Sequence, residues 1–453
     1  MADPFSIEIG AFQPDGSIAL HEVVTAASRR VSQVTFTFSR PGGCADLDFL
    51  LQMPFDQYGT TFDSPRARIR YFDDVALRIN GAVWWRGYVR VIERKLTIPE
   101  TVHIRASGYA TRLEDATVTW RFGRQGLKNA GSVGELAGVV ESFFLLVPLL
   151  LGTDPDLPHP IADRYVIDGS AIKARSLVFD NVSLHQIFTE VAALAGNYDW
   201  GVDETRTFYF RRPQQLTDST AVYTSDPAVA TWSANQSGGT YGDETYTDPQ
   251  PIPPYLPIEN AAVFVIGGDV QLIDGQESVE GVKNVLTIYG APEHKGDPVQ
   301  VITVADPGWI DAWGQRLMGR VSTAFFTDPG DLATWGRQRL RLMGHPQTKG
   351  SVESPVHERL IHPTGAVRII DVATGQEIVE RISAVRYTLN ESGQLITRVE
   401  FAYSLPADQY FSEHLRRDQT LAQNTLAQAP TPFILTERMR WPSDGWTATV
   451  RPQ

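Results

Sequence analysis

The sequence predicts an α+β fold that is mainly β: two antiparallel β-barrel or β-sandwich domains with covering helices, a helical insertion and an extended C-terminal tail. Short segments in which apolar and polar residues alternate recur along most of the chain. Turn residues separate these segments, which is typical of antiparallel β-structure. Helical periodicity is confined to a few short segments, so the helices are expected to cover sheets rather than form a bundle.

The composition limits the possible classes of function. The chain has 453 residues and a formal net charge of −13, and at ~150 residues per domain it should form about three domains. An acidic protein is poorly suited to holding nucleic acid, which needs a positive surface. Cys44 is the single cysteine. A disulfide framework within the chain is therefore excluded, and we expect Cys44 to be a small buried residue.

Neither a secretory signal nor a membrane-spanning segment is predicted. The N-terminal residues MADPFSIEIG contain no basic stretch followed by an apolar one. The longest apolar run, residues 143–151, is interrupted by Pro148 and is shorter than the ~20 residues that a spanning helix needs. We therefore expect a soluble chain that is made in the cytoplasm.

Residues 1–115 are predicted to form the first β domain. Between residues 75 and 85, Asn80-Gly81 separates two alternating arms and predicts a hairpin with a type I′ turn. Further segments with strand periodicity are residues 34–38, 67–71, 87–94 and 101–107. Several short strands at this spacing favour a barrel or sandwich.

Residues 116–175 are predicted to be a helical insertion. Ser132 can cap a helix that continues until Pro148. Its apolar positions at helical spacing are Leu136, Val139, Val140 and Phe143. The helix carries more apolar residues than one face needs. Burial within its own domain and packing on a neighbouring subunit therefore both remain open.

Residues 176–212 are predicted to form a strand, a helix and two more strands. Ser183 and Gln186 have the spacing of a capping box, and Gly196 predicts the end of the helix. The apolar helix positions are Leu184, Ile187, Phe188, Val191 and Leu194, and the following strands are residues 198–202 and 207–210. Because one face of the helix is so apolar, we expect it to cover a sheet.

The second β-rich domain is predicted to combine residues 176–212 with residues 260–405. A Pro-rich strap, residues 213–259, interrupts it. Strands are expected at residues 263–266, 285–290, 366–371, 385–389 and 395–403, and helices at residues 307–318 and 331–343. Residues 406–453 are expected to form a polar helix, residues 408–428, and a tail that docks on partner proteins.

No catalytic, cofactor-binding or metal-binding residue is predicted. His357-Glu358 and His362 resemble the zinc motif H-E-x-x-H, but the two histidines are five residues apart instead of four. On a helix this spacing turns them ~140° away from each other, so they are expected to be solvated loop residues. The sequence contains no G-x-S-x-G, Walker or G-x-G-x-x-G motif. We therefore expect the protein not to be an enzyme.

Adjacent carboxylates are also poor candidates for catalysis. Asp73-Asp74 and Glu114-Asp115 are such pairs, and neighbouring residues on a strand point to opposite faces. A glycosidase needs both carboxylates on one face. These residues are therefore predicted to be turn or edge charges.

Two sets of residues give the chain a resemblance to the tail hub, or baseplate hub, proteins of long-tailed bacteriophages. The first is residues 176–212, where a strand and a capped helix ending in L-A-G precede W-x-V-D and an aromatic strand. The second is a W-x-G-x-V-like strand followed by a G-Y-like pair and an R-L-like turn. Its residues are Trp85, Gly87, Val89, Gly108, Tyr109, Arg112 and Leu113.

The resemblance implies two domains like tail-tube subunits, and a structural role in the virion. A homo-trimer of such chains would offer six similar positions to a hexameric tail tube and would sit at the tail tip. It would contact tail-tube and distal-tail proteins and fibre or spike proteins, and DNA would only pass through its channel. The resemblance does not extend to the insertion, the strap or the C-terminal tail.

Two other functions remain open. A distal-tail or carbohydrate-binding adsorption protein would use exposed tryptophans, for which Trp84, Trp309 and Trp313 are candidates. Burial of these rings would count against that function. A cell-wall-degrading tail enzyme is less favoured, because the sequence offers no credible set of acid, base and nucleophile.

Overall fold

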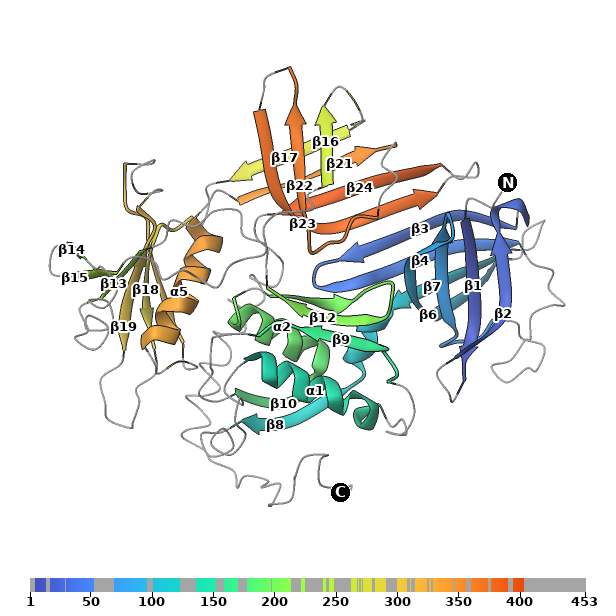
Figure 1. Ribbon diagram of the computed structural model, residues 1–453, viewed down its shortest axis with the longest axis horizontal. Coiled ribbons are helices and arrows are strands. Elements are labelled where there is room, and N and C mark those ends of the chain that lie inside the picture. Colours follow the sequence, from blue (N-terminus) through green and yellow to red (C-terminus); the bar gives the residue numbers. More distant parts are fainter. Residues whose placement is uncertain are drawn as a thin grey trace. The chain divides into compact units, whose positions relative to one another are not determined.

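The computed structural model consists mainly of β-strands, with a few helices (Figure 1). The predicted class, α+β and mainly β, is confirmed. The structure describes residues 5–13, 17–28, 30–52, 69–95, 101–122, 136–151, 159–169, 177–196, 198–212, 221–224, 239–241, 244–247, 262–266, 268, 270, 272–278, 282–290, 300–307, 310, 314–323, 326, 329–344, 347–355, 360–373, 376–389 and 394–402. The predicted helix and tail in residues 406–453 therefore lie outside the described residues.

A single 16-stranded sheet contains strands from both predicted β domains. Its main path follows the order β17 (Leu272–Ser278), β21 (Gln347–Ser354), β24 (Leu395–Ala402), β23 (Gln376–Leu389), β3 (Val31–Ser39), β4 (Gly42–Gln52), β7 (Thr101–Gly108), β6 (Ala82–Lys95), β5 (Asp74–Ile79), β1 (Phe5–Phe12) and β2 (Ile18–Thr25). Strand β3 pairs with β23 in antiparallel fashion. This pairing joins residues that are about 350 positions apart in the sequence.

The local predictions for residues 1–115 are mostly confirmed. Asn80 and Gly81 have φ angles of 50° and 81°, as a type I′ turn requires, and they connect β5 to β6. The predicted strand at residues 67–71 is wrong for its described part, because residues 69–72 form a bend and a turn. The backbone N–H of Asp73 donates to the Arg70 carbonyl at 3.3 Å and closes this turn.

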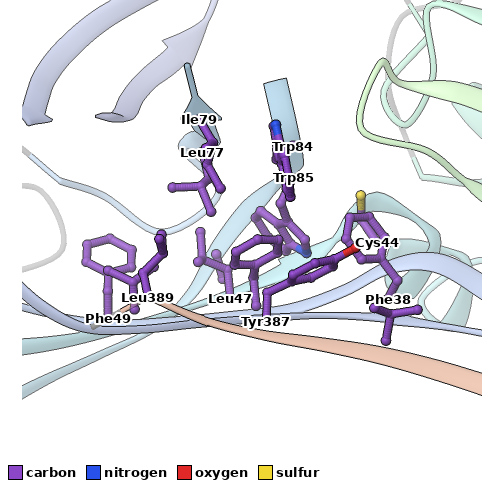
Figure 2. Packing of buried hydrophobic residues seen from close by; sticks show 14 of the residues in the cluster. Phe38, Cys44, Leu47, Phe49, Leu77, Ile79, Trp84, Trp85, Tyr387 and Leu389 are labelled. Carbon is purple, nitrogen blue, oxygen red and sulfur yellow. The ribbon is translucent and has the colours of Figure 1, made fainter. Parts of the chain in front are cut away.

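A continuous apolar core lies between strands of the large sheet. Figure 2 shows side chains of β5 and β6 facing those of β3, β4 and β23. Tyr387 stacks on Phe36 with ring centroids 4.8 Å apart, and the Trp84 ring meets it edge-on at 5.6 Å. The register of β5 and β6 shifts opposite Trp84, and such a bulge lets neighbouring Trp84 and Trp85 both be buried. Cys44 is also buried in this core, as predicted.

Two helices cover the strands that follow the first β region. Helix α1 (Leu136–Leu150) packs against α2 (Leu184–Leu194). The neighbouring strands are β8 (Thr117–Phe122), β9 (Arg164–Ile167), β10 (Leu177–Ser183), β11 (Asp199–Val202) and β12 (Thr207–Arg211). Phe144 of α1 and Phe188 of α2 both contact Phe208 of β12, with ring centroids 4.4 and 5.4 Å apart. The prediction that the Ser183 helix covers a sheet is therefore confirmed.

The Ser183 cap is confirmed, but only half of the capping box forms. The Ser183 hydroxyl accepts a hydrogen bond from the Gln186 backbone N–H at 3.3 Å. The Gln186 side chain donates to Glu190 at 2.9 Å instead of turning back to the cap. Gly196 adopts a φ of 108° directly after the helix, which explains why a glycine ends it.

The insertion helix α1 buries most of its apolar surface within the chain. Its buried residues are Leu136, Ala137, Val139, Val140, Phe143, Phe144 and Val147. Leu145 and Leu149 remain 50% and 48% exposed. Pro148 lies inside the helix and does not end it as predicted. The missing bond affects only the last turn, because Leu151 still donates to the Val147 carbonyl at 3.0 Å.

A second, six-stranded sheet contains β14 (Gly239–Tyr241), β15 (Glu244–Thr247), β13 (Ala221–Thr224), β19 (Val301–Ala305), β18 (Val285–Tyr289) and β20 (Met318–Ser322), in that order. Three of these strands lie in residues 213–259, the range of the predicted strap. Helix α5 (Pro329–Gly344) packs on β18 and β19. Gly336 of α5 allows this approach, because a Cβ there would meet the Ile288 and Val304 side chains.

The other predictions for residues 260–405 have mixed outcomes. Strands β16 (Ala262–Ile266), β18 and β22 (Ala366–Asp371), the long hairpin arms in β23 and β24, and the helix at residues 331–343 are confirmed. Five of the twelve residues of the predicted helix at residues 307–318 lie outside the described residues, and residues 314–317 near its C-terminal end are not helical. Its last residue, Met318, begins strand β20 instead.

Candidate functional site: a buried polar junction

The most distinctive chemical feature of the described structure is a set of buried polar side chains where β1, β4, β5, β6 and β7 meet the segment from residue 159 to residue 212. We call this set the polar junction. It consists of Arg40, Asp74, Arg86, Tyr109, His159, Asp163, Asp199 and Arg206. All but Asp163 are mostly or fully buried.

Arg206 is the centre of the polar junction. It lies in the turn between β11 and β12 and is 2% exposed. Its guanidinium lies over the Phe12 ring at 4.5 Å and over the Tyr109 ring at 4.8 Å, which is the arrangement of a cation–π contact. The φ of Arg206 is 56°. This is an unusual backbone conformation for an arginine, and the turn holds it because the Arg206 N–H donates to Asp203 at 3.0 Å.

The same arginine holds the end of the insertion. Arg206 Nη1 lies 2.9 Å from Asp163 Oδ1, and Nη2 donates to the His159 carbonyl at 3.2 Å. In return, the Asp163 backbone N–H donates to the Arg206 carbonyl at 2.8 Å. One side chain therefore connects the first β region, the insertion and the β11–β12 hairpin.

Asp74 forms a second part of the junction. The Tyr109 hydroxyl donates to Asp74 Oδ1 at 2.6 Å, and Arg86 Nε approaches both carboxylate oxygens at 2.9 and 3.2 Å. Burial raises the pKa of the Asp74 carboxyl, and the charge of Arg86 opposes that rise. Tyr109 belongs to the G-Y-like pair of the sequence resemblance. The structure thus gives this tyrosine a definite partner.

The prediction that adjacent carboxylates are turn or edge charges holds for some of them only. Asp73 accepts from the Arg70 backbone N–H at 2.7 Å within a turn, although it is buried. The prediction of an edge charge is wrong for Asp74, because β5 is an inner strand between β1 and β6. Glu114 and Asp115 are exposed, as expected for turn charges.

Arg40 and Asp199 form a fully buried ion pair in the third part of the junction. Each side chain is 3% exposed. Burial raises the pKa of the Asp199 carboxyl, whereas the nearby charge of Arg40 lowers it. The pair spans 159 positions of sequence and fixes β11 beside β4. Buried ion pairs of this kind specify one arrangement more than they add stability.

Glycines allow the backbones to approach closely around these charges. Strands β4 and β11 pair in parallel, with Gly201 opposite Gly42 and Val202 opposite Gly43. A Cβ on Gly43 or Gly201 would overlap the backbone of the partner strand. The motif glycines Gly87 and Gly108 also face each other across β6 and β7. These positions therefore need glycine for space.

The remaining candidate residues do not join the junction. His362 lies 3.7 Å from Glu204, whose pKa burial raises, while His357 and Glu358 lie outside the described residues. Within the described ranges, no group of three or more histidine, cysteine, aspartate or glutamate residues could hold a metal ion. Trp84 is 8% exposed, and Trp309 and Trp313 lie outside the described residues. No helix of the described part is long and apolar enough to cross a membrane.

Sequence reasoning missed Arg40, Asp163, Asp199 and Arg206. The available signals were weak: glycines beside a Trp-rich strand, and an arginine inside a turn. Neither signal identifies a partner more than 40 positions away. Apart from Asp163, the junction is mostly buried, and its ion pairs and hydrogen bonds join segments that are far apart in the sequence, so its evident role is to fix the arrangement of these segments.

Comparison with known proteins gives a fold but no close relative. No protein-family model matches the chain, and no curated protein matches it. Among solved structures, the 43 kDa tail protein of prophage MuSo2 from Shewanella oneidensis is similar. It has a TM-score of 0.50 and 13% identity, and the match covers 88% of this chain and 97% of that one. The prophage tail protein gp18 from Listeria monocytogenes EGD-e has a TM-score of 0.50 and 14% identity, with 92% and 99% covered.

The chain therefore has a fold found in phage tail proteins. The match extends over nearly the full length of both solved structures. The resemblance to tail proteins that the two sets of sequence motifs indicate is confirmed at the level of fold.

Proposed function

We propose that this protein is a structural component of a bacteriophage tail, located in the virion, and that it acts without catalysis. The observation that carries this proposal is the match to two prophage tail proteins over at least 88% of this chain. The buried polar junction agrees with it, because its charges pair with one another and connect segments of the chain. The acidic net charge of −13 suits a wall that DNA passes without binding.

Within the tail, we propose that the chain is the hub that connects the tail tube to the tail tip or spike. A homo-trimer would surround a DNA channel and contact tail-tube, distal-tail and fibre or spike proteins. The continuous sheet supports this role, because the β3–β23 pairing joins two β regions into one stiff unit. A connector that carries load between tube and tip needs such stiffness.

Electron microscopy of tails that incorporate a tagged copy of the chain would test this function. We expect the label at the tail tip, in a three-fold arrangement. Label along the whole tube would identify a tube subunit instead, and label on peripheral fibres would favour an adsorption protein. The buried Trp84 ring removes one of the three tryptophans on which a carbohydrate-binding groove would depend.

A direct assay separates the structural role from a cell-wall-degrading one. Purified protein should leave the turbidity of a peptidoglycan suspension unchanged. Clearing that is lost in an Asp74→Asn variant would contradict the structural assignment.

A further inference from the structure

His159 is a partly buried histidine whose two ring nitrogens both have partners. Nε2 lies 3.1 Å from the Phe144 carbonyl of α1, and Nδ1 lies 3.4 Å from the backbone nitrogens of both Ile161 and Ala162. The ring also stacks on the Phe144 ring at 4.3 Å, with the two planes 16° apart. The side chain thus clamps the segment after residue 159 to helix α1.

These contacts require one form of the ring. A carbonyl accepts, so Nε2 must carry the hydrogen; backbone N–H groups donate, so Nδ1 must be the unprotonated acceptor. A proton added to Nδ1 would point at two N–H donors and remove both hydrogen bonds. The geometry is therefore satisfied only by the neutral imidazole.

We propose that His159 is an acid-sensitive clamp on the polar junction: when Nδ1 takes up a proton, residues 159–163 detach from helix α1 and loosen their connection to Arg206. The connection is direct, because Arg206 donates to the His159 carbonyl and pairs with Asp163. Opening the clamp would leave Arg206 on Phe12 and Tyr109 but release residues 159–163.

The charged groups around His159 do not stabilise an imidazolium strongly. Arg206 disfavours it and Asp163 favours it, but Asp163 is already paired with Arg206 and half exposed. On α1, Glu141 is occupied by the Tyr165 hydroxyl of β9 at 3.1 Å. Arg164 of β9 donates to Thr207 at 2.7 Å. No carboxylate among the described residues contacts the ring.

The direction of the pH effect follows from these surroundings. Burial lowers the pKa of His159 below its ordinary value. A histidine with a lowered pKa in the closed state is neutral there. The closed state is therefore fully favoured above the pKa of the open state, and it becomes less favoured as the pH falls below that pKa. With an open-state pKa of ~6.5, the equilibrium for local opening should rise between pH 7.5 and pH 5.5, by at most about tenfold.

Hydrogen–deuterium exchange on the full chain tests the clamp. After correction for the intrinsic pH dependence of exchange, we expect amide opening in α1 and at residues 161–163 to increase at pH 5.5, by at most about tenfold. His159→Asn should abolish this increase, because its side-chain oxygen can accept from the two backbone N–H groups but cannot take up a proton. The control His21→Asn, at an exposed position, should retain it.

His185 needs a separate variant, because burial also lowers its pKa and it lies on α2 beside Trp200. His185→Gln should keep the pH-dependent opening at residues 161–163. An equal increase in native protein and His159→Asn, or no increase in native protein, would overturn the proposal.

If His159→Asn does not fold, the imidazole of the native chain can be titrated by NMR, with His159→Gln used for assignment. A pKa at or above ~6.5 would contradict the clamp. Neither measurement depends on whether the chain assembles into a tail, so the clamp and the proposed hub role can fail independently.

Discussion

The apolar core and the polar junction hold neighbouring parts of this protein together in opposite ways. In the core, aromatic rings of Phe36, Trp84 and Tyr387 pack without charges. In the junction, Arg40 and Arg206 are buried with carboxylate and aromatic partners. Apolar packing stabilises in proportion to the buried area and is non-directional, so no ring needs one particular partner. Each buried charge, in contrast, needs its own partner. The core therefore supplies stability, and the junction fixes the arrangement.

The largest effect should come from the core. Phe36→Ala should lower the free energy of unfolding by about 3–5 kcal/mol, since it removes a fully buried ring and leaves a cavity. Urea denaturation followed by tryptophan fluorescence would measure this change. Leu20→Ala is the control, because Leu20 is 52% exposed and should change stability by less than ~0.5 kcal/mol. Equal effects of the two variants would show that Phe36 is not in a packed core.

Breaking the buried Arg40–Asp199 pair should lower the free energy of unfolding by a similar amount, but a second substitution should be able to restore it. Arg40→Met should lower stability by about 3–5 kcal/mol at pH 8, because it leaves the Asp199 charge buried without its partner. The double variant Arg40→Met/Asp199→Leu should recover most of the loss, as apolar replacement of both partners often does. No apolar second substitution should rescue Phe36→Ala in this way.

The pH dependence of the stability loss in Arg40→Met distinguishes a buried unpaired charge from a cavity in the apolar core. Burial raises the pKa of Asp199, so the folded protein takes up a proton at this carboxyl more readily than the unfolded chain. The cost of the ionised carboxylate is present above the folded-state pKa and is relieved as pH falls through it. The loss in Arg40→Met should therefore be smaller at pH 5 than at pH 8 when unfolding is measured in urea at both values. A pH-independent loss would mean that the Asp199 charge is not responsible.

A medium effect on stability is expected from a substitution at Gly108, which lies where the apolar core meets the polar junction. Gly108 ends β7 next to Tyr109, and a Cβ there would overlap the Cys44 carbonyl. Gly108→Ala should lower stability by about 1–3 kcal/mol, because the backbones of β4 and β7 must separate. Gly275→Ala provides the matched control, since no atom lies within 4 Å of its added Cβ. Thermal unfolding of the two variants would show whether close approach, rather than glycine itself, matters.

The smallest effect concerns the helix that covers β11 and β12. Ser183→Ala should lower stability by about 1 kcal/mol, because the Gln186 N–H loses its capping acceptor. Gln186→Ala should have a smaller effect, since its side chain bonds to Glu190 and does not complete the capping box. If both variants lost the same stability in urea denaturation, a reciprocal capping box would exist in solution after all.

Local sequence signals predicted local structure well. Asn80-Gly81 identified its hairpin because the type I′ turn needs positive φ at both positions, and Ser183 with its apolar pattern identified helix α2. The alternation at residues 67–71 wrongly predicted a strand in its described part, because periodicity does not reveal whether a neighbouring strand is available to pair with it. At Pro148, the helix continued because a proline near the last turn removes only a bond that the end of a helix can spare.

Long-range pairing could not be predicted in the same way. Nothing in the residues of β3 and β23 states that they are neighbours, since both simply alternate. The charges of Arg40 and Asp199 were visible, but burial and partner choice depend on the whole fold. The resemblance to phage tail proteins indicated the fold found in such proteins, because it rests on glycine and aromatic residues that the fold places at close contacts, but it did not identify which strands pair.

The most direct test of the hub assignment is the mass of the chain in solution, measured by light scattering with and without the neighbouring proteins of the same tail. The proposed role predicts a trimer, either alone or after a tail-tube or spike partner is added. A chain that remains a monomer with every tail partner, and that instead binds a glycan, would contradict it.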